Sequence, residues 1–337
     1  MAVMKDVARL AGVSITTVSF VLNGTAKEHK VADKTASKVL KAAKQLGYKA
    51  NSADHGDILR YVPTTIAFFT PMNSARMDMG VVYDTIHKHI KQTQNQYNIL
   101  LCPYERGLLP EKIRQVDAGS YDAAVVVVDN SADAENLEKI EESMPFVLYN
   151  AHSKRFSSVF SNAEDPIRQA VTMIAAKGYR RIVLMAGSEN GKSGNEYLSD
   201  LIRICSEQGI TIPDQAFITT ENTTMGGGIA AHHILGMESK PEMIICMNSS
   251  LAYGAIPVLA RNEFFVPKNA ELLCFGTSGD ADLVMNYIPS LSMIMIPVDE
   301  ITTRAFDIAL HLSCDRDTQP LHLTCPCTLL LNRSFSI

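Results

Sequence analysis

The chain has 337 residues, of which 46% are hydrophobic and 20% are charged, and its formal net charge is −5. This length predicts two or three domains, and the composition is that of a globular protein with a large core. No apolar run reaches the roughly 18 residues of a bilayer span, and no signal-peptide hydrophobic stretch opens the chain. The seven cysteines are therefore interpreted as reduced core thiols of a cytoplasmic protein.

The N-terminal stretch predicts two short helices joined by a tight turn. Lys5–Ala11 has helical apolar spacing, and Gly12 suits the left-handed conformation that ends such a helix. Ser14 is a good N-cap for a second helix over Ile15–Asn23. The residues expected on the buried faces are Val7, Leu10, Ala11, Val18, Val21 and Leu22. This is the pattern of a DNA-binding helix-turn-helix, and an ordinary amphipathic hairpin is the plainer alternative.

The residue identities in this stretch indicate a particular protein family, which the helical periodicity alone does not. KDVARLAGVS, followed by TVS and VLNG, resembles the N-terminus of the LacI/GalR family of bacterial transcription regulators. GYKAN at Gly47–Asn51 is similar to the phrase that precedes the hinge of that family. The resemblance implies a sequence-specific DNA-binding head. The residues expected to contact DNA are Lys5, Ser14, Ile15, Thr16, Thr17, Ser19, Phe20, Asn23, Lys30, Asn51, Ile58 and Leu59.

These contacts are expected to differ in what they contribute. Ile15, Thr16 and Phe20 should carry sequence preference, whereas Lys5 and Lys30 should add affinity without it. The family often has an arginine where this chain has Phe20, and arginine pairs well with guanine. Because a phenyl ring donates no hydrogen bond, Phe20 is expected to contact a thymine methyl group or the sugar-phosphate.

Charge divides the chain at the end of the predicted head. Up to Ala53 there are nine basic and three acidic residues, a net charge of +6, which leaves −11 for the remainder. A basic head on an acidic body fits a phosphate-binding module attached to a body that avoids nucleic acid.

A third helix is predicted over Asp33–Leu46, and residues 51–61 are predicted to be a polar hinge or linker. In the LacI/GalR family this hinge becomes a helix on DNA and wedges a leucine into the minor groove. Counted from Asn51, the wedge position of this chain is Asp57. We therefore expect either a shifted register, with Ile58 or Leu59 as the wedge, or a linker that does not bend DNA.

Residues 62–337 alternate strands and helices, which predicts doubly wound parallel sheets in two lobes. This architecture resembles the periplasmic-binding-protein-like effector domain of the family. The first lobe is expected at about 62–161 and 293–324, and the second at about 162–292 and 325–337. The expected strands are Ile66–Thr70, Ile99–Cys102, Ala123–Val128, Phe146–Tyr149, Arg181–Met185, Ala216–Thr219, Met243–Met247, Glu271–Phe275 and Met293–Ile296.

An effector is expected where strand ends of the two lobes meet. By the resemblance, hydrogen-bonding side chains are expected at Asn73, Tyr197, Asn248, Thr277 and Ser278. Neutral residues there replace charged ones of the family, so the ligand should be a neutral sugar or nucleoside. The loop Ala186–Asn195 looks like a P-loop but has its first glycine one place late, so a nucleotide hydrolase is disfavoured.

The sequence thus predicts a homodimeric transcription repressor that binds an operator and a small molecule, without an enzymatic activity, cofactor or metal. Two alternatives stay open. One is a regulator of the same fold that has lost small-molecule control. The other is a cytoplasmic solute-binding protein, which the basic head argues against. No C-terminal heptad suggests a tetramerisation helix, and the sequence does not decide between a dimer and a tetramer.

Overall fold

The computed structural model describes residues 3–22, 25–26, 28–46, 48, 64–72, 78–93, 97–116, 118–128, 131–138, 140, 145–187, 196–314 and 319–336. The predicted hinge therefore lies outside the described residues, as does most of the P-loop-like segment. Five of the predicted contact residues also lie outside them: Asn23, Asn51, Ile58, Leu59 and Asn73.

Three helices form the N-terminal head: α1 (Met4–Ala11), α2 (Ile15–Leu22) and α3 (Asp33–Gln45). Their shared core consists of Val7, Ala8, Val18, Val21, Leu22, Val39, Ala42 and Ala43. Leu10, expected in this core, is instead 52% exposed. The reason is geometric, because α1 packs through Ala8, and a residue two places further along a helix is rotated by about 200°.

The first lobe contains a sheet of six parallel strands in the order β11-β5-β4-β3-β1-β2. Its strands are β1 (Thr64–Pro71), β2 (Tyr97–Tyr104), β3 (Ala123–Val127), β4 (Phe146–Tyr149), β5 (Ser157–Asn162) and β11 (His322–Pro326). Its helices are α5 (Met79–Thr93), α6 (Leu109–Gln115), the short 3-10 helix η1 (Ala118–Ser120), α7 (Ser131–Glu138) and α13 (Val298–Cys314).

The second lobe contains a sheet in the order β12-β10-β9-β8-β6-β7, in which β12 is antiparallel to β10 and the other described pairs are parallel. Its strands are β6 (Ile182–Gly187), β7 (Phe217–Thr220), β8 (Met243–Cys246), β9 (Glu271–Thr277), β10 (Ser292–Ile296) and β12 (Thr328–Leu330). Its helices are α8 (Glu164–Ala176), α9 (Glu196–Glu207), α10 (Thr224–Gly236), α11 (Ser249–Arg261), α12 (Ala281–Asn286) and the 3-10 helices η3 (Asp214–Ala216) and η4 (Ser278–Asp280).

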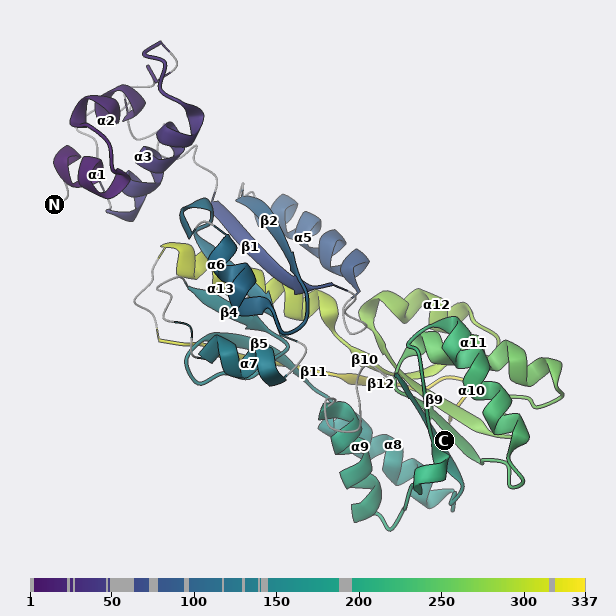
Figure 1. The fold of residues 1–337 in the computed structure, drawn as a ribbon. Helices are drawn as coiled ribbons and strands as arrows, with labels where there is room; N and C mark the ends of the chain where they lie inside the picture. Colours follow the sequence, from purple (N-terminus) through teal and green to yellow (C-terminus); the bar gives the residue numbers. More distant parts are fainter. Residues whose placement is uncertain are drawn as a thin grey trace.

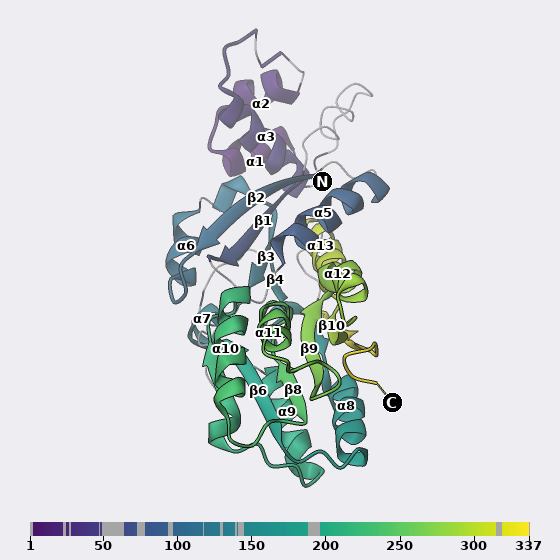
Figure 2. The ribbon, with the colours of Figure 1, turned by 90° about the vertical axis from the view of Figure 1, so that its right-hand side faces the viewer.

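Each sheet is covered by helices on both faces. Along β1, Ile66 and Phe68 pack toward α5 and α13, whereas Ala67 and Phe69 pack toward α6 and α7. Because both faces of the sheets are dry, central strands such as β3, β4 and β8 are apolar throughout, and strands of this kind are recognisable in a sequence. The predicted doubly wound α/β fold is therefore correct. Figures 1 and 2 show the two lobes end to end, with the head beyond the first lobe.

The chain crosses between the lobes after β5, after β10 and between β11 and β12. The expected return to the first lobe at residue 293 is too early, because Ser292–Ile296 pairs with β9 in the second sheet. Near the C-terminus, β11 and β12 follow each other with only Cys327 between them, yet they belong to different sheets. In both places, the strand with which a segment pairs decides which lobe it belongs to, and the local sequence does not show this.

Glycines let α10 and α11 approach closely. A β-carbon added at Gly254 would lie 1.8 Å from the carbonyl oxygen of Thr224, and one at Gly227 would lie 2.2 Å from that of Leu251. Such distances are far below van der Waals contact, so any larger residue would push the two helices apart. The glycine-rich start of α10 is therefore explained by packing.

We predict that Gly254→Ala lowers the free energy of unfolding by about 2 kcal/mol or more, because the methyl group overlaps the backbone of α10. Urea unfolding followed by circular dichroism measures this. Gly236→Ala is the matched control, since a β-carbon at this exposed end of α10 meets nothing within 4 Å. Equal unfolding midpoints for Gly254→Ala and the parent chain would contradict the close approach.

Candidate DNA-binding head and effector site

The turn between α1 and α2 fixes the start of α2. Gly12 ends α1 with a φ of 68°, a conformation that side-chain-bearing residues rarely adopt. Ser14 Oγ accepts a hydrogen bond from the backbone N–H of Thr17 at 3.1 Å and lies 2.9 Å from Thr17 Oγ1. The predicted N-cap is therefore present, and both hydroxyls already have partners within the head.

The outward side of α2 carries four of the twelve predicted DNA contacts. Ile15 is 48% exposed and Thr16 is exposed, while Ser19 and Phe20 are half-buried. Ile15 and Ser19 are four residues apart, as are Thr16 and Phe20, so each pair lies on one row of the helix surface. Four of the predicted residues are thus brought together on one side of α2.

Phe20 is not a free side chain. Its ring stacks on the imidazole of His29, with ring centroids 3.6 Å apart and an interplanar angle of 9°. Thr25 donates to the Phe20 carbonyl oxygen through its backbone N–H at 3.0 Å and through Oγ1 at 3.2 Å. No sequence pattern singles out His29, which lies in a polar segment after α2.

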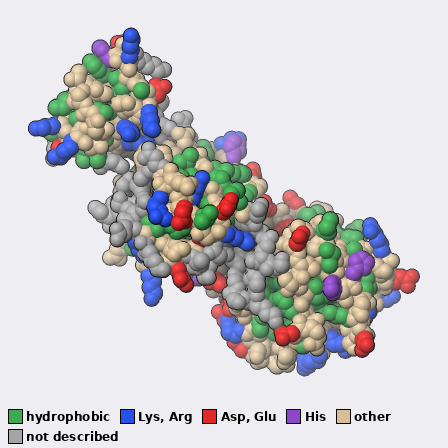
Figure 3. Space-filling view, in the orientation of Figure 1, with side chains coloured by type: hydrophobic (Ala, Val, Ile, Leu, Met, Phe, Trp, Pro, Cys, Tyr) green, Lys and Arg blue, Asp and Glu red, His purple; other side chains and the backbone are tan. Residues whose placement is uncertain are grey.

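The head carries several exposed basic side chains. Lys5, Lys30, Lys34 and Lys38 are all exposed. Figure 3 shows several Lys and Arg side chains on the visible face of the head and few acidic ones. The head also contacts the first lobe, because Lys41 Nζ donates to the carbonyl oxygen of Gly119 at 2.9 Å. A positive surface of this kind suits the phosphates of DNA.

Four predicted effector residues lie at or just after strand ends, or at a helix start, in the second lobe. Asn248 caps α11 by accepting from the N–H of Ser250 at 2.8 Å, and Thr277 caps η4. Ser278 Oγ accepts from the backbone N–H of Asp299, in the first lobe, at 3.4 Å. Tyr197 is in the first turn of α9.

Tyr197 also reaches the first lobe. Its hydroxyl is hydrogen-bonded to Ser161 Oγ, and it accepts a long hydrogen bond of 3.5 Å from Asn150 Nδ2. Asn150 Oδ1 in turn accepts from Ser161 Oγ at 2.7 Å and from its N–H at 3.0 Å. The Tyr197 ring stacks on Phe275 in its own lobe, with centroids 6.0 Å apart. We call Asn150, Ser161 and Tyr197 the interlobe clasp.

A carboxylate lies beside these neutral residues. Asp280 Oδ2 accepts from the N–H of Thr277 at 2.8 Å, and Oδ1 accepts from Ser249 Oγ at 3.0 Å and Tyr253 Oη at 3.1 Å. Burial, together with the neighbouring Asp280 charge, raises the pKa of Tyr253. Asp280 was missed because it follows the β9 end by three residues. Its hydrogen bonds hold the end of β9 against α11 within the second lobe.

Asn222 is a further polar residue beyond a strand end. Its Oδ1 is buried and has no hydrogen-bond partner among the described residues. A β-carbon at Gly187, at the end of β6, would lie 2.5 Å from the Asn222 amide, so Gly187 makes room for it. An unpaired buried acceptor is costly, which makes a donor from a ligand favourable there.

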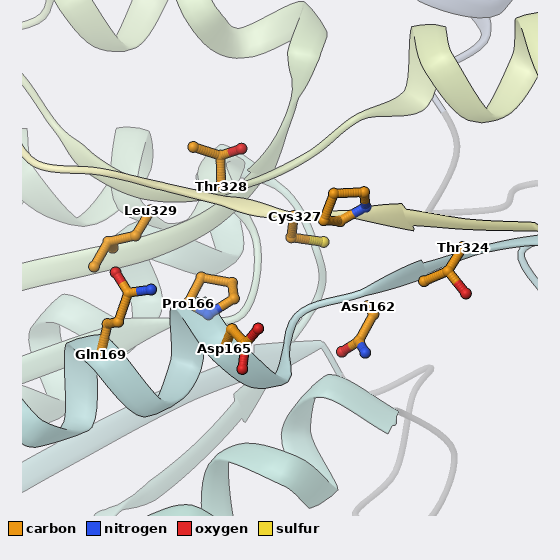
Figure 4. A pocket seen from close by; sticks show the side chains of 9 residues that line it. Asn162, Asp165, Pro166, Gln169, Thr324, Cys327, Thr328 and Leu329 are labelled. Atoms are coloured by element: carbon orange, nitrogen blue, oxygen red, sulfur yellow. The ribbon is translucent and has the colours of Figure 1, made fainter.

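A cavity of about 350 Å³ lies where the chain crosses between the lobes. It is lined by Asn162, Asp165, Pro166, Gln169, Thr324, Pro326, Cys327, Thr328 and Leu329. Figure 4 shows these side chains coming from the end of β5, from α8 and from the β11–β12 crossing. None of the four described effector candidates, Tyr197, Asn248, Thr277 and Ser278, lines it, so this cavity and those strand-end residues are separate places.

The cysteines at this crossing are buried thiols. Burial raises the pKa of Cys325 to about 11 and that of Cys327 to about 12. Within the part of the chain that the structure describes, no group of three His, Cys, Asp or Glu residues could hold a metal ion.

The family model for bacterial regulatory proteins of the lacI family matches residues 3–51, and the model for a periplasmic binding protein-like domain matches residues 171–335. The HTH-type transcriptional repressor PurR of Vibrio atlanticus is 26% identical over 324 residues, covering 94% of this chain and 93% of that protein. The chain belongs to the lacI family.

Two solved structures share the fold of this lacI-family chain over 99% of its length. One is the lac repressor dimer bound to operator and the anti-inducer ONPF, with a TM-score of 0.68, 20% identity and 98% of that chain covered. The other is the transcriptional regulator CelR–cellobiose complex, with a TM-score of 0.67, 19% identity and all of that chain covered.

Membership of the lacI family makes this protein a DNA-binding transcription regulator and not an enzyme. The solute-binding alternative is set aside, because the head that the lacI-family model matches is a DNA-binding domain. Among the described helices, none is both long and apolar enough to cross a membrane.

We predict that Ser14→Ala loosens the head of this lacI-family protein by about 1 kcal/mol, because the Thr17 N–H loses its cap. In the full chain, hydrogen exchange of the α2 amides should become about five-fold faster. Ser37→Ala, an exposed substitution on α3, is the control and should leave exchange in α2 unchanged. Unchanged exchange in Ser14→Ala would show that the hydroxyl does not hold the turn.

Proposed function

We propose that this regulator is a homodimeric repressor whose two heads bind the half-sites of a palindromic operator. The outward side of the capped helix α2, with Ile15 and Thr16 exposed above a valine-rich core, carries this proposal. One short helix reads few base pairs, so two heads related by symmetry are needed for useful specificity. The operator-bound lac repressor dimer, which shares the fold, supports this assembly.

Within the proposed complex, Ile15, Thr16 and Phe20 read bases, and Lys5 and Lys30 bind phosphates. The other predicted DNA contacts remain part of the proposal: Ser14, Thr17, Ser19, Asn23 and, in the linker, Asn51, Ile58 and Leu59.

Exposed apolar side chains on the second lobe offer a surface for the second copy. Met225 and Ile229 of α10 are 73% and 49% exposed. Leu283 and Met285 of α12 are 51% and 59% exposed, and Ile288, just beyond α12, is 89% exposed. Large apolar side chains that are exposed in the single chain are candidates for an interface with another copy. Burying them against a second copy would stabilise the dimer.

We predict that selection from random duplex DNA yields an inverted repeat, because each copy of the dimer contributes one head. The full-length protein is incubated with the library, and bound DNA is sequenced after several rounds. A single unrepeated half-site would contradict the dimeric mode of binding. Recovery of no motif would contradict sequence-specific binding itself.

We further propose that a neutral ligand binds near the strand ends of the second lobe and changes operator affinity. The residues that support this offer hydroxyl and amide groups without positive charge: Tyr197, Asn222, Asn248, Thr277 and Ser278. The tyrosine ring suits the apolar face of a sugar or a nucleobase. The CelR–cellobiose complex has the same fold with a neutral sugar bound.

The interlobe clasp favours a second candidate, a regulator that works without a ligand. Tyr197, Ser161 and Asn150 satisfy one another across the lobes, as a bound ligand would otherwise do. In a ligand-responsive protein, the ligand must compete with this contact. In a ligand-independent one, the clasp itself holds the lobes in the DNA-binding arrangement.

We predict that saturating neutral sugars or nucleosides raise the thermal midpoint by about 5 °C, because a ligand bound to the folded state stabilises it. Thermal-shift screening of sugars, nucleosides and their phosphates measures this. Stabilisation by phosphates alone would contradict a neutral ligand and direct attention to Lys192, outside the described residues.

Tyr197→Phe separates the two candidates. A smaller thermal shift with unchanged operator affinity of the ligand-free protein supports the ligand-responsive regulator. Weaker operator binding without any ligand supports the clasp as the working element. Tyr287→Phe is the matched control, because its hydroxyl donates to the Tyr253 carbonyl oxygen within one lobe.

A further inference from the structure

We propose that His29 determines operator specificity together with Phe20, as one stacked unit at the end of α2. The proposal rests on α2 being the reading helix and adds a residue from the following segment. Three observations carry it: the tight stack of the two rings, the backbone contacts that hold His29 in place, and the exposure of its side chain.

The stack covers one face of Phe20. With centroids 3.6 Å apart and planes within 9° of parallel, the imidazole lies flat on the phenyl ring. Phe20 is half-buried, whereas His29 is exposed. Phe20 therefore cannot approach DNA with both faces free, and whatever reaches its outer side also meets the edge of His29.

His29 is held by the backbone on both sides. Its N–H donates to the carbonyl oxygen of Thr25 at 3.2 Å, and the N–H of Val31 donates to that of Ala26 at 2.9 Å. Val31 packs against the core of the head, and Lys30 between them has a positive φ of 56°. The imidazole is thus pre-positioned, which lowers the entropy lost when it binds.

The chemistry of the imidazole supplies what Phe20 lacks. A phenyl ring offers bases only apolar contact, whereas each imidazole nitrogen donates or accepts a hydrogen bond. Guanine presents two acceptors in the major groove, and adenine and cytosine present amino donors. The unit then reads one base pair with an apolar surface and a polar edge side by side.

The charged neighbours of His29 in the sequence suggest an alternative role for it, which is binding phosphate instead of reading bases. Glu28 and Lys30 are both exposed, and a lysine there binds phosphate without regard to sequence. If His29 acted in the same way, its removal would weaken all DNA sequences equally. Sequence dependence therefore distinguishes reading from phosphate binding.

The test selects binding sites from random duplex DNA with the parent protein, His29→Ala, Phe20→Ala and the double variant at one salt concentration. We expect both single variants to lose base preference at the same positions of the half-site. On the parent's selected site, His29→Ala should bind about ten-fold more weakly, while binding to scrambled duplex changes less than two-fold. The double variant should lose little beyond either single one.

His29→Phe keeps a stacked ring but removes both nitrogens, and it separates packing from hydrogen bonding. It should fold like the parent by circular dichroism yet lose preference at the same positions. Lys30→Ala is the control and should weaken the selected and scrambled duplexes alike.

Two results would overturn the inference. One is an unchanged motif in His29→Ala, and the other is an equal loss on selected and scrambled duplexes. If the parent protein itself selects no motif, the proposed function fails instead, so the two failures are distinguishable.

Discussion

The two lobes are joined by three chain crossings, and this constraint governs how the body works. The crossings follow β5, follow β10 and separate β11 from β12, so the last two strands belong to different sheets. Each sheet is rigid because helices cover both faces. Relative motion of the lobes must therefore be absorbed at the crossings. Ser161 of the interlobe clasp lies one residue before the end of β5, where the first crossing begins.

The head and the interlobe clasp differ in how their polar and exposed side chains are arranged in the absence of a binding partner. In the head, a turn and an N-cap fix α2 so that its outward side chains need little reordering on binding. In the body, polar side chains at strand ends bond to one another across the lobes. A partner of the head loses less entropy on binding, because the side chains of α2 are already positioned. A partner of the clasp must replace the hydrogen bonds that its side chains make with one another.

How much of this followed from the sequence depends on the burial of each element. The nine expected strands were visible because buried parallel strands are apolar on both faces. β5 was missed because Ser157, Ser158 and Ser161 make it read as a loop, although all three are buried and hydrogen-bonded. The assignment of β10 to the first lobe was wrong for a different reason. Only the pairing of β10 with β9 shows that it belongs to the second lobe.

Some of the candidate functional residues could be predicted from the sequence and others could not. The exposed side of α2 followed from helix periodicity and from the family resemblance. Asp280, Asn222 and His29 did not, because their roles come from contacts with other segments. Leu10 shows the converse error, since helical spacing alone does not tell which of two adjacent faces meets the core.

The buried cysteines carry a consequence for the chemical durability of the body. Oxidants and alkylating agents react with thiolates, and a thiol with a pKa near 11 is ionised in only about one molecule in ten thousand at pH 7. Cys205 and Cys325 have pKa values raised to about 11, and Cys327 to about 12, in each case mainly by burial. Burial and low ionisation therefore slow the oxidation and alkylation of Cys325 in β11 and of Cys327, which lies between β11 and β12. At this crossing between the lobes, the packing of the chain itself shields the thiols from such reagents.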